Sequence, residues 1–157
     1  MAKIVLARID DRLVHGQVMT AWVQYTSANH IVIVDDATAG DEFTKTIIKM
    51  AVPVSIGLDI FNTEEASEKL KALPDSYRVI ILTKGPQVYY KLIEEGVEIE
   101  EVIIGGMGAS KARSKFYKNI SASEEEKDYF RKIVTKGVGL KIHVIPDEKS
   151  VSVDSLL

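Results

Sequence analysis

The chain has 157 residues, no cysteine and a formal net charge of −3 at pH 7, with 46% hydrophobic and 27% charged residues. This composition is typical of a globular protein, and we expect residues 1–157 to form a single domain. The lack of cysteine excludes disulfides, thiolate metal sites and cysteine nucleophiles, and the slightly acidic charge gives no support for a nucleic-acid partner.

We expect no signal peptide and no membrane span in this sequence. MAKIVLARID becomes charged too early for a signal peptide. No apolar run approaches the roughly 20 residues that cross a bilayer. We therefore expect a protein that meets a membrane, if at all, only at its surface.

Short apolar runs rich in β-branched residues recur along the chain and predict buried strands. They lie at residues 4–9, 31–34, 54–58, 79–82, 102–104 and 140–145. Between them, apolar residues three and four positions apart predict helices. The first two helical stripes are Val14, Val18, Trp22 and Tyr25, and Phe43, Ile47, Ile48 and Met50.

Boundary residues support the same alternation of strands and helices. Capping-box pairs, a first-turn proline and two terminal glycines mark the later helices, at Asn62 with Glu65, Ser123 with Glu126, Pro86, Gly96 and Gly137. A β-α repeat implies right-handed crossovers. The predicted fold is a single α/β domain with a mostly parallel central β-sheet and helices on both faces.

This fold brings four loops to one edge. In a parallel sheet every strand-to-helix loop leaves at the carboxyl edge, where ligands bind. The loops at residues 10–16, 35–36, 83–84 and 105–115 carry charged or glycine-rich sequence. We therefore expect them to share one rim.

His15 is the candidate nucleophile on this rim. It precedes Gly16 at the predicted start of a helix, where free N–H groups and the helix dipole favour an anion. Arg8 and Arg12 add fork-shaped donors suited to phosphate oxygens. Positive surroundings lower the pKa of an imidazole and keep it neutral. These residues could support phosphoryl transfer, although a structural histidine at a helix start is the competing interpretation.

The adjacent carboxylates Asp10 and Asp11 need a separate explanation, because carboxylates repel phosphate. At least one should pair with an arginine or cap the loop. Asp10 or Asp11 could also orient the imidazole of His15 through its other ring nitrogen.

Several segments of this chain resemble a known family. RIDDRLVHGQV resembles the active-site signature of the IIB component of the mannose/fructose/sorbose family of the bacterial sugar phosphotransferase system. VDDATAGDEFTKTIIKMAVP, IIGGM and KGVGLKIHVIPDE follow in family order. The resemblance covers essentially the whole chain, and the family fold is also a mostly parallel sheet between helices.

The resemblance implies a phosphotransferase that carries a phosphoryl group on histidine. His15 would receive the group from a phosphohistidine of a IIA partner and pass it to a hexose or amino sugar that enters through membrane-embedded IIC and IID partners. Arg12 would clamp the phosphoryl group within a cradle formed by Arg8 through Gln17, including Gly16. The chain would be cytoplasmic, associated with the inner face of the membrane through IIC and IID. Homodimers are common in the family, and no metal or organic cofactor is expected.

The chain departs from the family in two places. Gly85-Pro86 stands where many relatives carry Asn-Pro, and the segment after Met107 aligns poorly. Lys111, Arg113 and Lys115 could therefore form a basic docking rim or a solvated loop.

Other polar candidates have structural interpretations that we prefer. Gly106 could join a backbone nest for phosphate, but a tight turn is the simpler explanation. Asp35 and Asp36 could bind Mg²⁺, yet no third ligand is evident and acidic residues often cap helices. We expect His30 to be solvated and His143 to lie on a strand surface or edge. Trp22 and Tyr25 are expected in the core or in a dimer contact.

Two other functions remain open from the sequence. A phosphatase or mutase could use His15 as a covalent phosphohistidine, but it would need a second catalytic acid and a small-molecule pocket. A regulatory or nucleotide-binding module could use the glycine-rich segment, although the Rossmann and P-loop fingerprints are missing.

Overall fold

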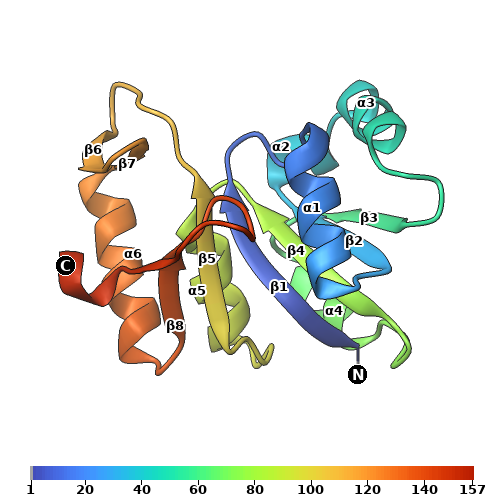
Figure 1. The fold of residues 1–157 in the computed structure, drawn as a ribbon. Coiled ribbons are helices and arrows are strands. Elements are labelled where there is room, and N and C mark those ends of the chain that lie inside the picture. Colours follow the sequence, from blue (N-terminus) through green and yellow to red (C-terminus); the bar gives the residue numbers. More distant parts are fainter. Residues whose placement is uncertain (1) are drawn as a thin grey trace.

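The computed structural model describes residues 2–157, and its strands and helices alternate along the chain (Figure 1). The strands are β1 (Lys3–Asp10), β2 (His30–Val34), β3 (Gly57–Phe61), β4 (Arg78–Thr83), β5 (Glu101–Gly106), β6 (Ser114–Tyr117), β7 (Ile120–Ala122), β8 (Gly139–Ile142) and β9 (Val151–Ser152). The helices are α1 (Gly16–Thr26), α2 (Asp36–Ala39), α3 (Glu42–Ala51), α4 (Ala66–Lys71), α5 (Pro86–Glu94) and α6 (Glu124–Thr135), followed by a 3-10 turn at Asp154–Leu156.

Seven strands form the central sheet in the order β3-β2-β4-β1-β5-β8-β9. All neighbouring pairs are parallel except β8 with the short β9. The strands β6 and β7 form a separate antiparallel hairpin. The predicted α/β fold with a mostly parallel sheet is therefore confirmed.

The sheet has a hydrophobic core on each face. Residues of α1 and α3 pack on one face, and residues of α4, α5 and α6 pack on the other. Because alternate residues of a strand point to opposite faces, Ala7 and Ile9 of β1 join the core under α5 and α6. Arg8 and Asp10 therefore lie on the face that α1 covers.

The predicted helix boundaries agree with the structure except at α4, which begins at Ala66 and not directly after Asn62. Ser123 and Glu126 form a complete capping box at the start of α6, and Asn62 and Glu65 exchange side-chain hydrogen bonds ahead of α4. Pro86 is the first residue of α5. The terminal glycines Gly96 and Gly137 have φ angles of +90° and +82°, which residues with a Cβ adopt only at a cost.

Two predicted strands are displaced and three were not predicted. The run at 54–58 contributes to β3 only from Gly57, because the chain turns at Pro53 and leaves Val54 fully exposed. The run at 140–145 ends as a strand at Ile142. β6, β7 and β9 are four, three and two residues long, too short to give a period that a sequence pattern could reveal.

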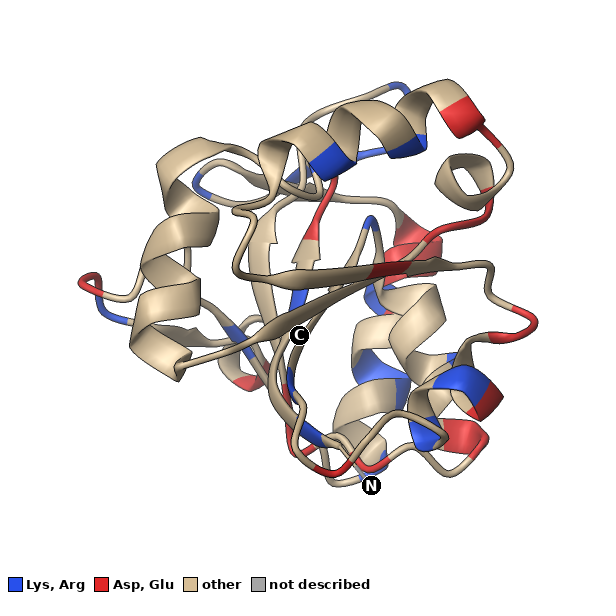
Figure 2. Cartoon of the chain, turned by 90° about the vertical axis from the view of Figure 1, so that its right-hand side faces the viewer, with Lys and Arg blue, Asp and Glu red and all other residues tan. Residues whose placement is uncertain are grey.

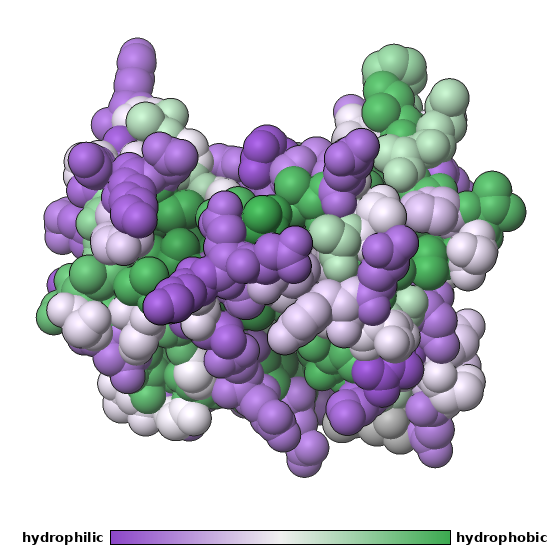
Figure 3. Space-filling view, viewed as in Figure 1, coloured by the Kyte–Doolittle hydropathy of each residue, from purple (hydrophilic) through white to green (hydrophobic). Residues whose placement is uncertain are grey.

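The stripe on α3 faces outward instead of into the core. Ile48 is buried, whereas Phe43, Ile47 and Met50 are 74%, 51% and 82% exposed. Apolar atoms gather over α3 at the upper right of the space-filling view (Figure 3). The helix lies towards the β3 edge of the sheet, and Ile48 is the residue of α3 that is buried in the core.

The expectations for two histidines were wrong. His30 is 7% exposed as the first residue of β2, with Nε2 2.7 Å from Asp59 Oδ2 and its ring stacked on Tyr77 at 4.4 Å. His143 is buried in the segment after β8, and its Nε2 lies 2.8 Å from the carbonyl oxygen of Glu148. Both rings are held by neighbours.

The surface carries charges of both signs. Lysine and arginine are interspersed with aspartate and glutamate over the side shown in Figure 2. Across the described residues, no helix is long and apolar enough to cross a membrane.

Candidate active site

The loop from β1 into α1 leaves the carboxyl edge of the sheet, at the top of Figure 1. The Leu13 N–H donates to the Asp10 carbonyl over 2.9 Å, which closes a tight turn. Leu13 and Gly16 have φ angles of +56° and +45°, and His15 between them is extended. These backbone turns direct the His15 side chain back towards Asp10.

Asp10 is the centre of the site. Its carboxylate is fully buried and accepts from Arg8 Nη1 at 2.6 Å, from the Arg12 N–H at 3.0 Å and from Arg12 Nε at 3.2 Å. His15 Nε2 lies 2.8 Å from Asp10 Oδ2. Burial by itself raises the pKa of Asp10, but these hydrogen bonds and the charge of Arg8 outweigh it and lower the pKa. Asp10 is therefore a permanent anion that joins two arginines and the histidine.

His15 is held by one nitrogen and free at the other. A carboxylate accepts hydrogen bonds only, so the neutral ring carries its hydrogen on Nε2 and leaves a lone pair on Nδ1. The side chain as a whole is 23% exposed. His15 is also the N-cap of α1 and makes no side-chain capping bond. The free N–H groups of the first turn therefore favour an anion beside the ring.

Arg8 lies beneath the site. Its side chain is fully buried, with Nη2 donating to the Val144 carbonyl over 2.8 Å and Nε lacking a partner among the described residues. Burial lowers the pKa of Arg8 although the charge of Asp10 opposes this shift. A Cβ on Gly105 would lie 2.1 Å from the Arg8 guanidinium carbon, so only glycine fits there. Arg8 is therefore buried beneath Asp10 and donates to its carboxylate, and direct contact of Arg8 with a phosphoryl group stays a prediction.

Arg12 and Gly106 border the exposed side of the site. The Arg12 side chain is 56% exposed, and its guanidinium donates to Asp10 through Nε at 3.2 Å and through Nη2 at 3.5 Å, so Nη1 is the nitrogen without a partner within residues 2–157. A Cβ on Gly106 would approach Asp10 Oδ1 to 2.8 Å and Arg12 Nη2 to 3.2 Å. Gln17 is exposed and lines a separate groove along α1 with Tyr25. The structure thus brings together Asp10, Arg12, His15, Gly16 and Gly106, and turns Gln17 aside.

Comparison with known proteins identifies the family of this chain. Residues 4–157 match the family model described as PTS system sorbose subfamily IIB component. The chain belongs to this family. It is 32% identical to the fructose-specific EIIB component of Bacillus subtilis, over 96% of this chain and 93% of the relative.

Solved structures support the same assignment. The IIBSor domain of the sorbose permease from Klebsiella pneumoniae matches with a TM-score of 0.92 and 30% identity, over 98% of this chain and 95% of that chain. The mannose-specific EIIAB component of Escherichia coli is 29% identical over 97% of this chain and 47% of its own length. The chain is therefore a sugar phosphotransferase component of the sorbose/mannose IIB type.

Asp11 and Arg113 form the outer frame of this IIB site. Asp11 Oδ2 accepts from the Gly108 N–H at 2.7 Å and from Arg113 Nη1 at 3.1 Å. Arg113 also pairs with Glu126 of α6, at 2.8 and 2.9 Å, and donates to the Lys84 carbonyl. Burial lowers the pKa of Arg113, but Glu126 and Asp11 raise it by more. Arg113 therefore joins three parts of the rim, and its spacing in the sequence gives no sign of this.

Tyr89 supports the site from the opposite face. It is fully buried on α5, and its hydroxyl lies 2.9 Å from the carbonyl oxygen of Arg8 and 2.8 Å from that of Ile81. Burial raises the pKa of Tyr89 well above its usual value, so the hydroxyl stays protonated as a donor. It fixes the ends of β1 and β4 where the site begins, a role that its helical spacing alone could not indicate.

The remaining acidic candidates of the IIB chain have structural partners. Asp35 caps α2 through Thr38 and lies 3.2 Å from Lys84 Nζ. Asp36 accepts from the N–H and the hydroxyl of Thr63. No group of three or more metal-ligand side chains occurs within residues 2–157.

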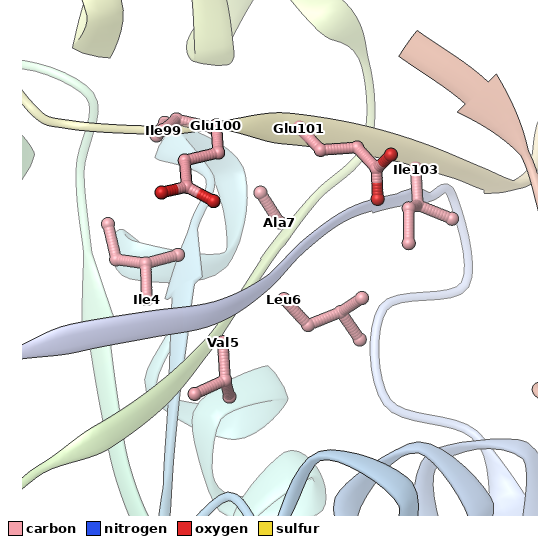
Figure 4. Close-up of a pocket in the computed structure, with 8 residues that line it drawn as sticks. All are labelled: Ile4, Val5, Leu6, Ala7, Ile99, Glu100, Glu101 and Ile103. Carbon is pink, nitrogen blue, oxygen red and sulfur yellow. The ribbon is translucent and has the colours of Figure 1, made fainter. Parts of the chain in front are cut away.

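A cavity of about 140 Å³ lies elsewhere, between β1 and β5 (Figure 4). It exists because these strands pair only from Arg8 onward and diverge towards their amino ends. Its walls are aliphatic apart from the carboxylates of Glu100 and Glu101. His15, Arg8 and Arg12 are absent from its lining, so this cavity is separate from the site around Asp10.

Proposed function

We propose that His15 accepts a phosphoryl group on Nδ1 from a phosphohistidine of a IIA partner and passes it to a hexose or amino sugar. The observation that carries this proposal is the hydrogen bond between Asp10 and Nε2 of His15, which leaves Nδ1 free beside Arg12 and the start of α1. The family assignment supports the same chemistry.

The charges of the site suit both transfers. When the Nδ1 lone pair attacks phosphorus, the N–P bond of the donor breaks and positive charge develops on the His15 ring. The Asp10 carboxylate at Nε2 stabilises that charge. In the second transfer a sugar hydroxyl attacks phosphorus, the Nδ1–P bond breaks, a proton is released and neutral His15 is restored. These steps use side chains alone, and we propose that no cofactor takes part.

We infer the partners from the family. The EIIAB name of the mannose-specific relative combines an A with a B component, which supports a IIA donor for this chain. We propose that IIC and IID hold the sugar in the membrane and that this chain works in the cytoplasm at the inner face. We also propose that residues 1–157 act as one IIB domain within a homodimer.

The proposal is tested by the intact mass of the protein after incubation with a phosphorylated IIA partner. We expect a gain of one phosphoryl group that is lost in acid and stable in base, as a phosphoramidate is. The control uses the same partner without prior phosphorylation. A protein that gains no mass with the phosphorylated partner would disprove the proposed function.

Replacing Arg12 by lysine is expected to slow phosphorylation of His15 by about 10-fold or more, although the charge is kept. The planar fork of arginine can hold Asp10 through Nε and Nη2 while Nη1 presents further N–H groups to phosphate oxygens, and an ammonium group cannot do both. Rapid-quench measurement of phosphoryl incorporation checks this, with Arg131→Lys on α6 as the matched control. Equal rates for Arg12→Lys and the wild type would exclude the clamp role.

A further inference from the structure

A second cavity opens directly beside the phosphoryl site. It has a volume of about 420 Å³, and its lining includes Arg12, the glycine-rich segment 105–108, Asn119 and Val144. It adjoins the carboxylate that holds His15, because Gly106 is at once part of its wall and in close approach to Asp10 Oδ1. Since Arg12 also lines the cavity, a molecule seated there would lie beside the group that holds His15.

The cavity is lined by both apolar and polar side chains, as sugar-binding sites are. Met107 and Ile120 are buried and, with Val144, supply an apolar surface for the C–H face of a ring. Asn119 is exposed in the turn between β6 and β7, and its amide makes no hydrogen bond within residues 2–157. An amide both donates and accepts, so it matches a hydroxyl group.

The wall of the cavity is held in place before any ligand arrives. Asp11 fixes the Gly108 N–H and Arg113, and Arg113 is tied to Glu126 of α6. The Ser121 N–H donates to the Met107 carbonyl over 2.8 Å, which joins β7 to the segment after β5. The Asn119 turn therefore has a defined position relative to Arg12, and binding costs little ordering.

We propose that this cavity receives the ring of the acceptor sugar during transfer from His15, and that Asn119 contacts a sugar hydroxyl. This inference rests on the proposed function and names the part of this chain that the acceptor touches. It makes Asn119 a specificity residue for the second transfer only, because the IIA donor presents a histidine and has no sugar ring to place there.

The test measures the two transfers separately in Asn119→Ala, Asn119→Trp and the control Ser114→Ala, which alters an exposed residue of the same hairpin outside the cavity. The first step is phosphorylation by the IIA partner. The second is discharge to sugar in membrane vesicles that contain IIC and IID, using whichever of fructose, sorbose, mannose and N-acetylgalactosamine discharges the wild type fastest.

We expect Asn119→Ala to raise the KM for sugar about two- to tenfold, the loss of one hydrogen bond, and Asn119→Trp to raise it further by filling the cavity. The rate of phosphorylation by the IIA partner and the KM for the phosphorylated protein in the discharge reaction should match the wild type in both variants. The control variant should match the wild type in all three quantities. If the KM for sugar is unchanged in Asn119→Ala and Asn119→Trp, this inference is wrong. It is also wrong if the KM for sugar and the KM for the phosphorylated protein rise equally, because that result indicates a docking surface. Neither result would contradict the proposed function. A wild type that fails the first step would overturn the proposed function and this inference with it.

Discussion

Replacing Asp10 by alanine is expected to lower the free energy of unfolding by about 3–5 kcal/mol and to abolish phosphoryl transfer. The change leaves the guanidinium of Arg8 buried without its carboxylate, with one nitrogen already lacking a partner. It also frees the His15 ring from the bond at Nε2 that fixes its tautomer. Urea unfolding and the phosphorylation assay measure the two effects.

The isosteric variant Asp10→Asn separates charge from packing. Because the pKa of Asp10 is lowered in the folded protein, the stability from its charge is fully present above the unfolded pKa of about 3.9 and is lost as pH falls through the folded value. The stability gap between wild type and Asp10→Asn should therefore shrink as the pH falls below about 4. A gap that is unchanged down to about pH 2 would contradict the role of the carboxylate.

Replacing His15 by alanine is expected to remove phosphorylation completely while changing stability by less than about 2 kcal/mol. The ring is partly exposed, and its one side-chain hydrogen bond is to Asp10, which keeps Arg8 and Arg12 as partners. Intact mass after incubation with the phosphorylated IIA partner gives the first result and thermal unfolding gives the second.

The matched control is His143→Gln, which replaces a buried histidine that the site does not use. It should gain one phosphoryl group as the wild type does. A His15→Ala protein that still gains this mass would mean that another residue is the acceptor.

The parts of the fold that were predicted are those with local signals. Continuous β-branched runs mark β1, β2, β4 and β5 because both faces of these strands are buried. The apolar stripe at residues 43–50 marks the helix α3 correctly, but periodicity shows only that apolar residues share a face and does not show whether that face meets the core or solvent. The strand order also depends on packing between segments distant in sequence, which no single run reveals.

The candidate site also has a part that the sequence predicts and a part that depends on contacts between distant segments. His15, Arg12 and Asp10 lie within one loop, so their residue types and spacing indicated a joint role. The burial of Arg8 could not be predicted, because it depends on the missing Cβ of Gly105 and on the Val144 carbonyl. The expected pairing of an aspartate of this loop with an arginine is confirmed, but the partner of Asp11 could not be predicted because Arg113 lies 102 positions away along the chain.

The central claim is that Asp10 holds Nε2 of His15 and so directs the phosphoryl group to Nδ1. Nitrogen-15 NMR of the histidine-labelled protein, recorded after phosphorylation by the IIA partner, distinguishes the two ring nitrogens directly. We expect the phosphoryl group on Nδ1 of His15, with Nε2 still carrying the hydrogen that Asp10 accepts. Phosphorylation at Nε2, or at the ring of another histidine, would contradict the account.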